Sequence, residues 1–167
     1  MFYKSKKQTS LDSLINRAFA PKNELIDIMF LFPPTTTGKD YSHRYGKEDL
    51  GDLNGNLIPL GIASLAAYLR KYGFGIAALD CITLELTHKA IVEIVRKKKP
   101  RSIGISATTY ALPASTTLAE RLRKEFPNLL IILGGAHANV AGEDAAKNIT
   151  SIDIVSYNPE GETVMLD

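Results

Sequence analysis

His43 is the residue whose type and setting most directly suggest metal chemistry in this sequence. It lies in DYSHRYG, residues 40–46, where an imidazole could coordinate a metal ion if a carboxylate oriented its second ring nitrogen. The position two residues before it is Tyr41, and the aspartate stands one residue earlier still, at Asp40. The segment also precedes the next helical pattern by about a dozen residues. We therefore expect a loop histidine here rather than a metal ligand.

Other residues with chemical potential follow apolar runs that predict strands. SATTYALP, residues 106–113, offers hydroxyl groups and one aromatic ring, which could bind a ligand or cap the next helix. GGAHAN, residues 134–139, begins with a glycine pair, which leaves room for a ligand at the backbone. His137 follows in the same segment and is expected to contact a ligand or cap a helix. His88 falls in a helical pattern and is expected on the surface. No charged pair suited to general acid–base catalysis is visible in these segments.

Alternating strand and helix patterns must position these segments. Continuous apolar runs predict strands, and amphipathic runs that end at glycine or proline predict helices. We expect strands at 25–32, 75–80, 102–107, 129–135 and 152–157, and helices at 58–73, 86–99, 113–126, 141–149 and 160–167. Helical crossovers between strands predict an α/β fold: a flavodoxin-like (Rossmann-like), doubly wound, five-stranded parallel sheet of order 2-1-3-4-5. Ligands of such sheets bind beyond the carboxyl ends of the strands, where the hydroxyl and glycine segments lie.

Composition restricts the possible partners. The 167 residues suit one domain with a real core, which we place at 25–167 after an N-terminal extension, 1–24. The net charge is +2; the extension carries +3 and the remainder −1, so nothing favours nucleic acid binding. Cys81 is the sole cysteine, which excludes a disulfide framework or a cysteine-rich metal site within the chain. No apolar run is long enough for a membrane span, so we expect a cytoplasmic location without a membrane partner.

Several nucleotide-binding functions lack their signatures in this chain. Neither G-x-G-x-x-G after a strand nor a P-loop occurs, and the acids of a phosphoacceptor receiver domain are missing. TTTG, residues 35–38, resembles the start of the flavodoxin phosphate loop, although the helix that should follow begins about twenty residues later. A flavin-binding electron-transfer module therefore stays open as an alternative. A ligand-free interaction domain is a third.

Four motifs at strand ends and one helix motif together indicate a family. They are LFPP (31–34), PLGIASLAAYLRKYG (59–73), GISATT (104–109), LGGAHA (133–138) and PEGE (159–162), with Asp80 at the end of the second strand. The chain thereby resembles the cobalamin-binding domain of B12-dependent radical SAM enzymes over residues 25–165. His43 and Gly46 also match half of D-x-H-x-x-G, a cobalt-ligand signature that radical SAM relatives generally lack.

The resemblance implies a base-off cobalamin whose corrin lies across the strand ends and whose nucleotide tail dips beside the third and fourth strands. The implied cofactor-binding residues are Pro34, Thr35, Ser106, Ala107, Thr108, Thr109, Tyr110, Gly134, Gly135, His137, Ala138, Tyr157, Glu160 and Gly161. No catalytic residue and no metal ligand is assigned.

The family's second domain, a C-terminal radical SAM domain, would be the partner of this one in a full-length parent. It binds S-adenosylmethionine and a [4Fe-4S] cluster through C-x-x-x-C-x-x-C, which this chain cannot supply with Cys81 alone. We expect the isolated domain to be inactive, and the parent to be a methyltransferase or an oxidative cyclase.

Overall fold

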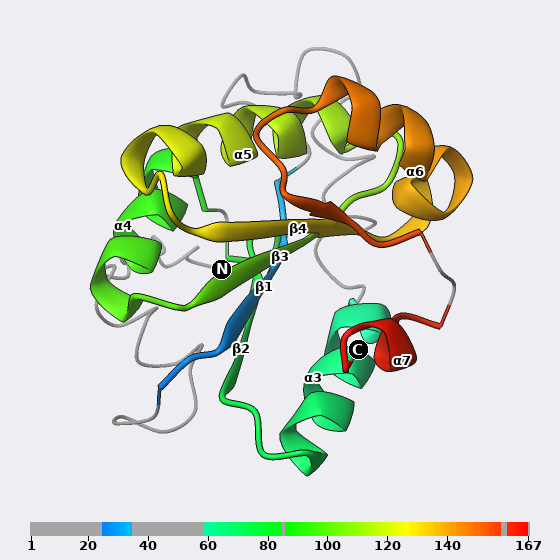
Figure 1. The fold of residues 1–167 in the computed structure, drawn as a ribbon. Coiled ribbons are helices and arrows are strands. Elements are labelled where there is room, and N and C mark those ends of the chain that lie inside the picture. Colours follow the sequence, from blue (N-terminus) through cyan, green and yellow to red (C-terminus); the bar gives the residue numbers. More distant parts are fainter. Residues whose placement is uncertain (1–24, 35–58, 85, 158–159, 167) are drawn as a thin grey trace, which may run out of the picture.

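A five-stranded parallel sheet forms the centre of the computed structural model, which describes residues 25–34, 59–84, 86–157 and 160–166 (Figure 1). The strands are β1 (Ile28–Phe32), β2 (Ile76–Asp80), β3 (Ser102–Ser106), β4 (Leu130–Gly134) and β5 (Ile154–Val155). Their order is β2-β1-β3-β4-β5, and every neighbouring pair is parallel. The predicted flavodoxin-like topology is confirmed.

Helices cover both faces of the sheet. They are α3 (Leu60–Lys71), α4 (His88–Lys98), α5 (Leu112–Glu125), α6 (Ala136–Asn148) and α7 (Gly161–Val164). The helices α4, α5 and α6 lie on one face, and α3 and α7 lie together on the other (Figure 1). None of the helices in the described part of the chain is both long enough and apolar enough to cross a lipid bilayer.

The alternation of side chains along β1 produces two separate cores. Met29 and Leu31 join the larger cluster under α4, α5 and α6, whereas Ile28 and Phe30 join the smaller one under α3. The Phe30 ring lies over Gly104 on β3, where an added Cβ would come within 2.6 Å of a ring carbon. Because strands buried on both faces consist of continuous apolar residues, IMFLF is the pattern expected at the centre of such a sheet.

Helix α4 shows how local sequence sets an element and its orientation. The Thr87 hydroxyl accepts a hydrogen bond from the Ala90 amide at 3.2 Å and caps the amino end. The helix ends where Lys99 adopts φ 50° and Pro100 follows. Its inward positions recur at helical spacing, and they begin at the first helical residue: His88, Ile91, Val92 and Val95 are buried.

Two sequence-based expectations are wrong. His88 is not on the surface: it is 4% exposed, because it occupies the first inward position of α4. The helix expected at 141–149 corresponds to α6, which begins at Ala136 instead of 141. Gly135, at φ +93°, turns the chain directly from β4 into this helix. A kink at Ala141, with φ −135°, divides that helix and explains why only its second half had a clear helical pattern.

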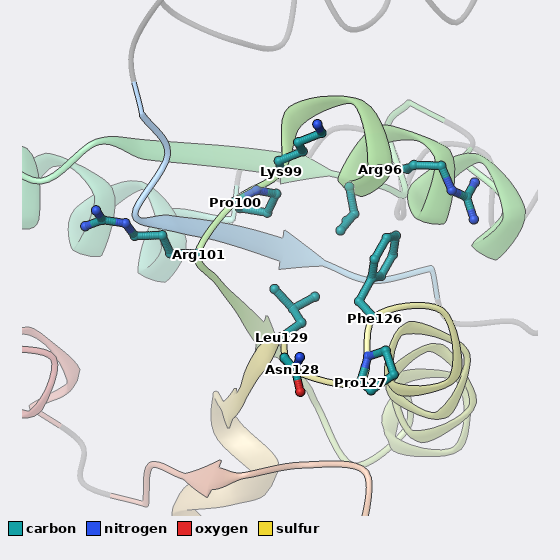
Figure 2. Close-up of a pocket in the computed structure, with 9 residues that line it drawn as sticks. Arg96, Lys99, Pro100, Arg101, Phe126, Pro127, Asn128 and Leu129 are labelled. Atoms are coloured by element: carbon teal, nitrogen blue, oxygen red, sulfur yellow. The ribbon is translucent and has the colours of Figure 1, made fainter.

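A hollow of about 450 Å³ lies at the amino-terminal edge of the sheet (Figure 2). The end of α4 and the loops that lead into β3 and β4 enclose it. We call it the amino-edge hollow; its lining residues are Val95, Arg96, Lys99, Pro100, Arg101, Phe126, Pro127, Asn128 and Leu129. It lies at the opposite end of the strands from the predicted ligand site.

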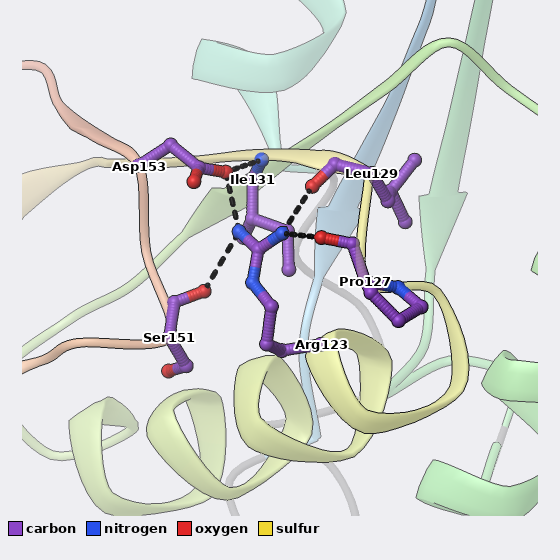
Figure 3. Close-up of polar contacts among 6 residues, drawn as sticks. All are labelled: Arg123, Pro127, Leu129, Ile131, Ser151 and Asp153. Carbon is purple, nitrogen blue, oxygen red and sulfur yellow. Dashed lines mark hydrogen bonds and ion pairs between the residues drawn. The ribbon is translucent and has the colours of Figure 1, made fainter.

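Arg123 on α5 fastens the short edge strand β5 to the rest of the fold (Figure 3). Its guanidinium donates to the carbonyl oxygens of Pro127 and Leu129 at 2.7 and 2.9 Å and pairs with Asp153 at 2.5 Å. The same Asp153 carboxylate accepts a hydrogen bond from the Ile131 amide at 2.8 Å. One cation thus connects the end of α5, the start of β4 and the segment before β5.

Candidate functional site

Small residues stand side by side where β3, β4 and β5 end. Ser106 pairs with Gly134 in the parallel register, and Ser156 follows on the far side of Gly134. A Cβ added at Gly134 would have its nearest neighbours, Ser156 Cβ and O, at 4.0 Å. The atoms of the described residues therefore do not require a glycine at this position. These residues leave the space beside Gly134 open at the carboxyl edge.

Gly135 differs from Gly134 although both belong to the same pair. Its φ is +93°, and an added Cβ would lie 2.8 Å from Ser106 Oγ and 2.9 Å from both Ala107 N and Ala107 O. The backbone of Ala107, just after β3, approaches too closely for any side chain here. Gly135 is therefore a requirement of the fold itself, and a substitution there cannot test for a ligand.

Ala107 connects the ends of β3 and β4 to the start of α6. Its amide donates to Gly134 O at 2.9 Å, and its carbonyl accepts from the His137 amide at 3.0 Å. The His137 ring is 8% exposed, and its Nδ1 lies 3.2 Å from Thr109 Oγ1. The sequence-predicted residues Ala107, Thr109 and His137 are thus brought together by hydrogen bonds. His137 lies in the first turn of α6 and does not cap it.

In the hydroxyl segment after β3, different residues serve the turn before the next helix and the edge where a ligand could bind. Thr108 Oγ1 accepts from the Ala111 amide at 3.2 Å, so this hydroxyl serves the turn that leads into α5. Ser106 and Thr109 remain at the edge of the sheet. Tyr110 follows with 57% of its surface exposed. It lies in the turn that joins the carboxyl end of β3 to α5.

Tyr157 borders the same edge from the far side, after β5, and is 60% exposed. Its side chain packs on α6 at Gly142, where an added Cβ would come within 2.5 Å of Tyr157 Cβ. Gly142 therefore lets the tyrosine lie close to the helix. Glu160 and Gly161 begin α7, which contacts α3 through a hydrogen bond from Ser64 Oγ to Glu162 at 2.7 Å.

The remaining predicted site residues do not belong to the group at the ends of β3 and β4. Ala138 is fully buried, and Pro34 is half-buried just after β1. Thr35 with the rest of TTTG, His43, and the extension 1–24 lie outside the described residues. Their predictions are not tested.

Sequence reasoning missed Ser156 and Gly142. Ser156 could have been found from register, because the pairing of Leu133 with Val155 places the next residue beside Gly134. Nothing in the sequence pattern singles out Gly142, because its role comes from the close approach of Tyr157 across the fold.

Asp80 and Cys81, at the carboxyl end of β2, serve the fold itself. Asp80 accepts hydrogen bonds from the Ile82 and Thr83 amides at 3.1 and 3.0 Å. Its carboxylate therefore stabilises the turn after β2 and does not point to a nucleotide ribose, the role an acid at this position has in dinucleotide-binding folds. Cys81 is buried, and burial raises the pKa of its thiol. Within the described ranges, no group of three His, Cys, Asp or Glu residues could hold a metal ion. The edge thus offers hydroxyls, backbone groups and one imidazole, which suit binding of a polar, uncharged surface better than acid–base chemistry.

Comparisons with known proteins agree with the fold. The family model described as B12 binding domain matches residues 47–165. An uncharacterized methyltransferase of Pyrococcus horikoshii is 32% identical over 104 residues, which cover 62% of this chain and 22% of that protein. Anaerobic magnesium-protoporphyrin IX monomethyl ester cyclases of Rubrivivax gelatinosus and of a Synechocystis strain are 28% and 33% identical over 70% and 65% of this chain. The matched part spans about a fifth of the length of these relatives.

Proposed function

Because this chain belongs to the B12 binding domain family, we propose that it holds a cobalamin at the carboxyl ends of β3, β4 and β5. The observation that carries this placement is the space beside Gly134, flanked by Ser106 and Ser156, at the edge where doubly wound sheets bind ligands. No atom of the described chain needs that space. A nucleotide tail that enters beside β3 and β4 would use it.

The chemistry of the edge supports a ligand of this kind. A corrin carries amide side chains around its rim, and these can both donate and accept hydrogen bonds. Ser106 and Thr109 offer hydroxyls, and the His137 ring is held in place through its contact with Thr109. We propose that these three residues bind polar groups of the cobalamin and fix its orientation. The exposed rings of Tyr110 and Tyr157 would border the macrocycle and limit the access of water to it.

The bound cofactor would be base-off, without a protein ligand from His43. Its dimethylbenzimidazole would lie in the space at the sheet edge, and the His137 ring at that edge would serve to bind polar groups through its contact with Thr109. When bound, cobalamin supplies a cobalt centre that can carry a methyl group or act as a nucleophile. The part of this chain is to bind and orient the cofactor.

We further propose that the domain works within a larger, cytoplasmic enzyme of the B12-dependent radical SAM type. Two kinds of relative support this: one is named a methyltransferase and the others anaerobic cyclases, and the matched part is about a fifth of each. The resemblance of the strand-end motifs supports a C-terminal radical SAM domain, with S-adenosylmethionine and a [4Fe-4S] cluster, as the partner.

Loading with hydroxocobalamin tests the proposal. After desalting, the chain is expected to retain about one cobalamin per chain and a red colour, whereas flavin mononucleotide treated in the same way is lost. After reduction, the cob(II)alamin EPR spectrum should lack nitrogen superhyperfine splitting and should be the same in a His43→Ala variant. Retention of flavin instead of cobalamin would overturn the function. Nitrogen splitting that disappears in His43→Ala would overturn the base-off, ligand-free state.

A further inference from the structure

Three residues at the proposed cobalamin edge turn to the same face of the sheet. They are Ser106 at the end of β3, Gly134 at the end of β4 and Ser156 just after β5. Each follows a residue that packs into or against the larger core, so strand alternation directs each toward the other face. Because neighbouring strands lie about 4.8 Å apart, the two serines stand about 10 Å apart with the open position of Gly134 between them.

An apolar pair lies below this row, on the same face. Ile132 pairs with Ile154 in the parallel register, two residues before Gly134 and Ser156. Ile132 is 9% exposed and Ile154 is 46% exposed. An apolar surface below an open position suits the flat body of an aromatic ring. This pair therefore supports an aromatic tail base, but it does not select one base over another.

Ser156 presents two polar groups to the open position. Its Cβ, which carries the hydroxyl, and its carbonyl oxygen both lie 4.0 Å from where a Gly134 Cβ would be. The Ser156 amide donates to Leu133 O at 2.8 Å, but no described residue forms a hydrogen bond with its hydroxyl or its carbonyl oxygen. A hydroxyl can donate and accept, whereas a carbonyl oxygen only accepts. The complementary ligand edge has an N–H donor beside a ring nitrogen that accepts.

Cobamides differ in their tail base, and the bases differ at this edge. Dimethylbenzimidazole ends in two methyl groups, and its one free nitrogen in a base-off cofactor is an acceptor, which the Ser106 hydroxyl alone can serve. Adenine instead carries an amine beside a ring nitrogen. The amine can donate to Ser156 O while the Ser156 hydroxyl donates to the ring nitrogen. Methyl groups in the same place would take water from both Ser156 groups and return no hydrogen bond, which is unfavourable.

We propose that Ser156 is a specificity-determining residue, which makes the site prefer a cobamide with an adenine base over cobalamin. This inference rests on the proposed function, because it requires the tail of a cobamide beside Gly134. The Ser106 hydroxyl can serve either base, whereas Ser156 serves only a base with a polar outer edge. Cobalamin still binds, but more weakly than its adenine counterpart.

Absorbance titrations with three cobamides in their hydroxo forms test the preference. The bases are adenine, dimethylbenzimidazole, and purine without the amine. Adeninylcobamide should bind at least about fivefold more tightly than hydroxocobalamin, the low end of the cost of a buried polar group without a partner. Adenine also coordinates cobalt more weakly than dimethylbenzimidazole, which by itself favours a base-off state. Purinylcobamide shares that property but lacks the amine, so it should bind more weakly than adeninylcobamide.

A variant isolates the Ser156 hydroxyl. Ser156→Ala keeps the backbone and the carbonyl oxygen, so it should fold as the parent does. It should weaken the binding of adeninylcobamide by a factor of about three to ten, the range of one neutral hydrogen bond, and change that of hydroxocobalamin by less than about twofold. Thr150→Ala removes an exposed hydroxyl in the turn before β5 and is the matched control, which should change neither affinity.

The possible failures separate this inference from the proposed function. If none of the three cobamides binds, the proposed function is wrong and the inference is wrong with it. If all three bind equally, cobamide binding stands and the preference is overturned. The preference is also overturned if adeninylcobamide and purinylcobamide bind equally, or if Ser156→Ala leaves the ratio of affinities unchanged, because weak coordination to cobalt would then account for it.

Discussion

Replacing His88 by leucine is expected to stabilise the domain. The side chain is 4% exposed, and neither ring nitrogen has a hydrogen-bond partner among the described residues. A buried polar group without a partner costs about 1–3 kcal/mol, because it loses its hydrogen bonds to water and gains none. Leucine has a similar volume and no polar atom. We therefore expect the free energy of unfolding to rise by about 1–2 kcal/mol at pH 7.5, after a small loss for imperfect packing.

The effect of His88→Leu should grow in acid. Burial, and then the positive charge of Arg121, lower the pKa of His88 below its ordinary value. The unfolded chain therefore binds a proton at a higher pH than the folded chain does, so the parent loses stability as the pH falls through about 6.5. The largest slope from one such group is about 1.4 kcal/mol per pH unit. His88→Leu removes this loss, and its advantage over the parent should be larger at pH 5.5 than at pH 7.5.

Urea unfolding followed by circular dichroism at the two pH values measures both effects. Ile91→Val, one turn further along the same buried face of α4, is the matched control and should cost about 0.5–1.5 kcal/mol equally at both. The reasoning fails if His88→Leu is less stable than the parent at pH 7.5. It also fails if the difference between the two proteins does not change with pH.

Three further predictions test other parts of the structure. Burial alone would raise the pKa of Asp153, but hydrogen bonds from a backbone amide and Arg123 hold it below its ordinary value, so Asp153→Asn should cost about 1 kcal/mol in urea unfolding at pH 7. That cost should diminish near pH 2, where the parent carboxyl also loses its charge; an equal cost at both pH values would contradict the ion pair. Gly135→Ala should cost at least about 2 kcal/mol because of its positive φ and close contacts, whereas Gly61→Ala, in open space on α3, should be neutral or stabilising. Cys81 should react with a thiol reagent only at the rate of unfolding, since burial raises the pKa of its thiol, and rapid labelling of the folded chain would show that it is accessible.

Periodicity and chain punctuation were sufficient to predict the sheet. The apolar run of β1, the proline after α4 and the strand–helix alternation together specify a doubly wound order, which the structure confirms. The start of α6 was mispredicted because AHANV has no clear amphipathic pattern. What begins that helix is the backbone of Gly135, and a positive φ cannot be read from a glycine in a sequence.

Residue types located the candidate site better than they explained it. The segments after β3 and β4 do meet at one edge, as the topology requires. The different roles of Gly134 and Gly135 depend on what lies opposite each Cβ, and the packing of Tyr157 on Gly142 joins elements distant in sequence. Such contacts across the fold follow from tertiary packing and leave no local pattern. His88 is the opposite case, because its spacing to the buried Ile91 and Val95 already indicated an inward position.

The most direct test of the cobalamin site is the affinity of Gly134→Val for hydroxocobalamin. The added side chain meets no atom of the described chain closer than 4.0 Å from its Cβ, and valine favours strands, so the variant should fold as the parent does. Ala146→Val, on the exposed part of α6, is the control. Absorbance titration should show the parent and the control binding with equal affinity, and Gly134→Val at least about tenfold weaker, the equivalent of about 1.4 kcal/mol. A folded Gly134→Val that binds as tightly as the parent would contradict the placement of cobalamin beside Gly134.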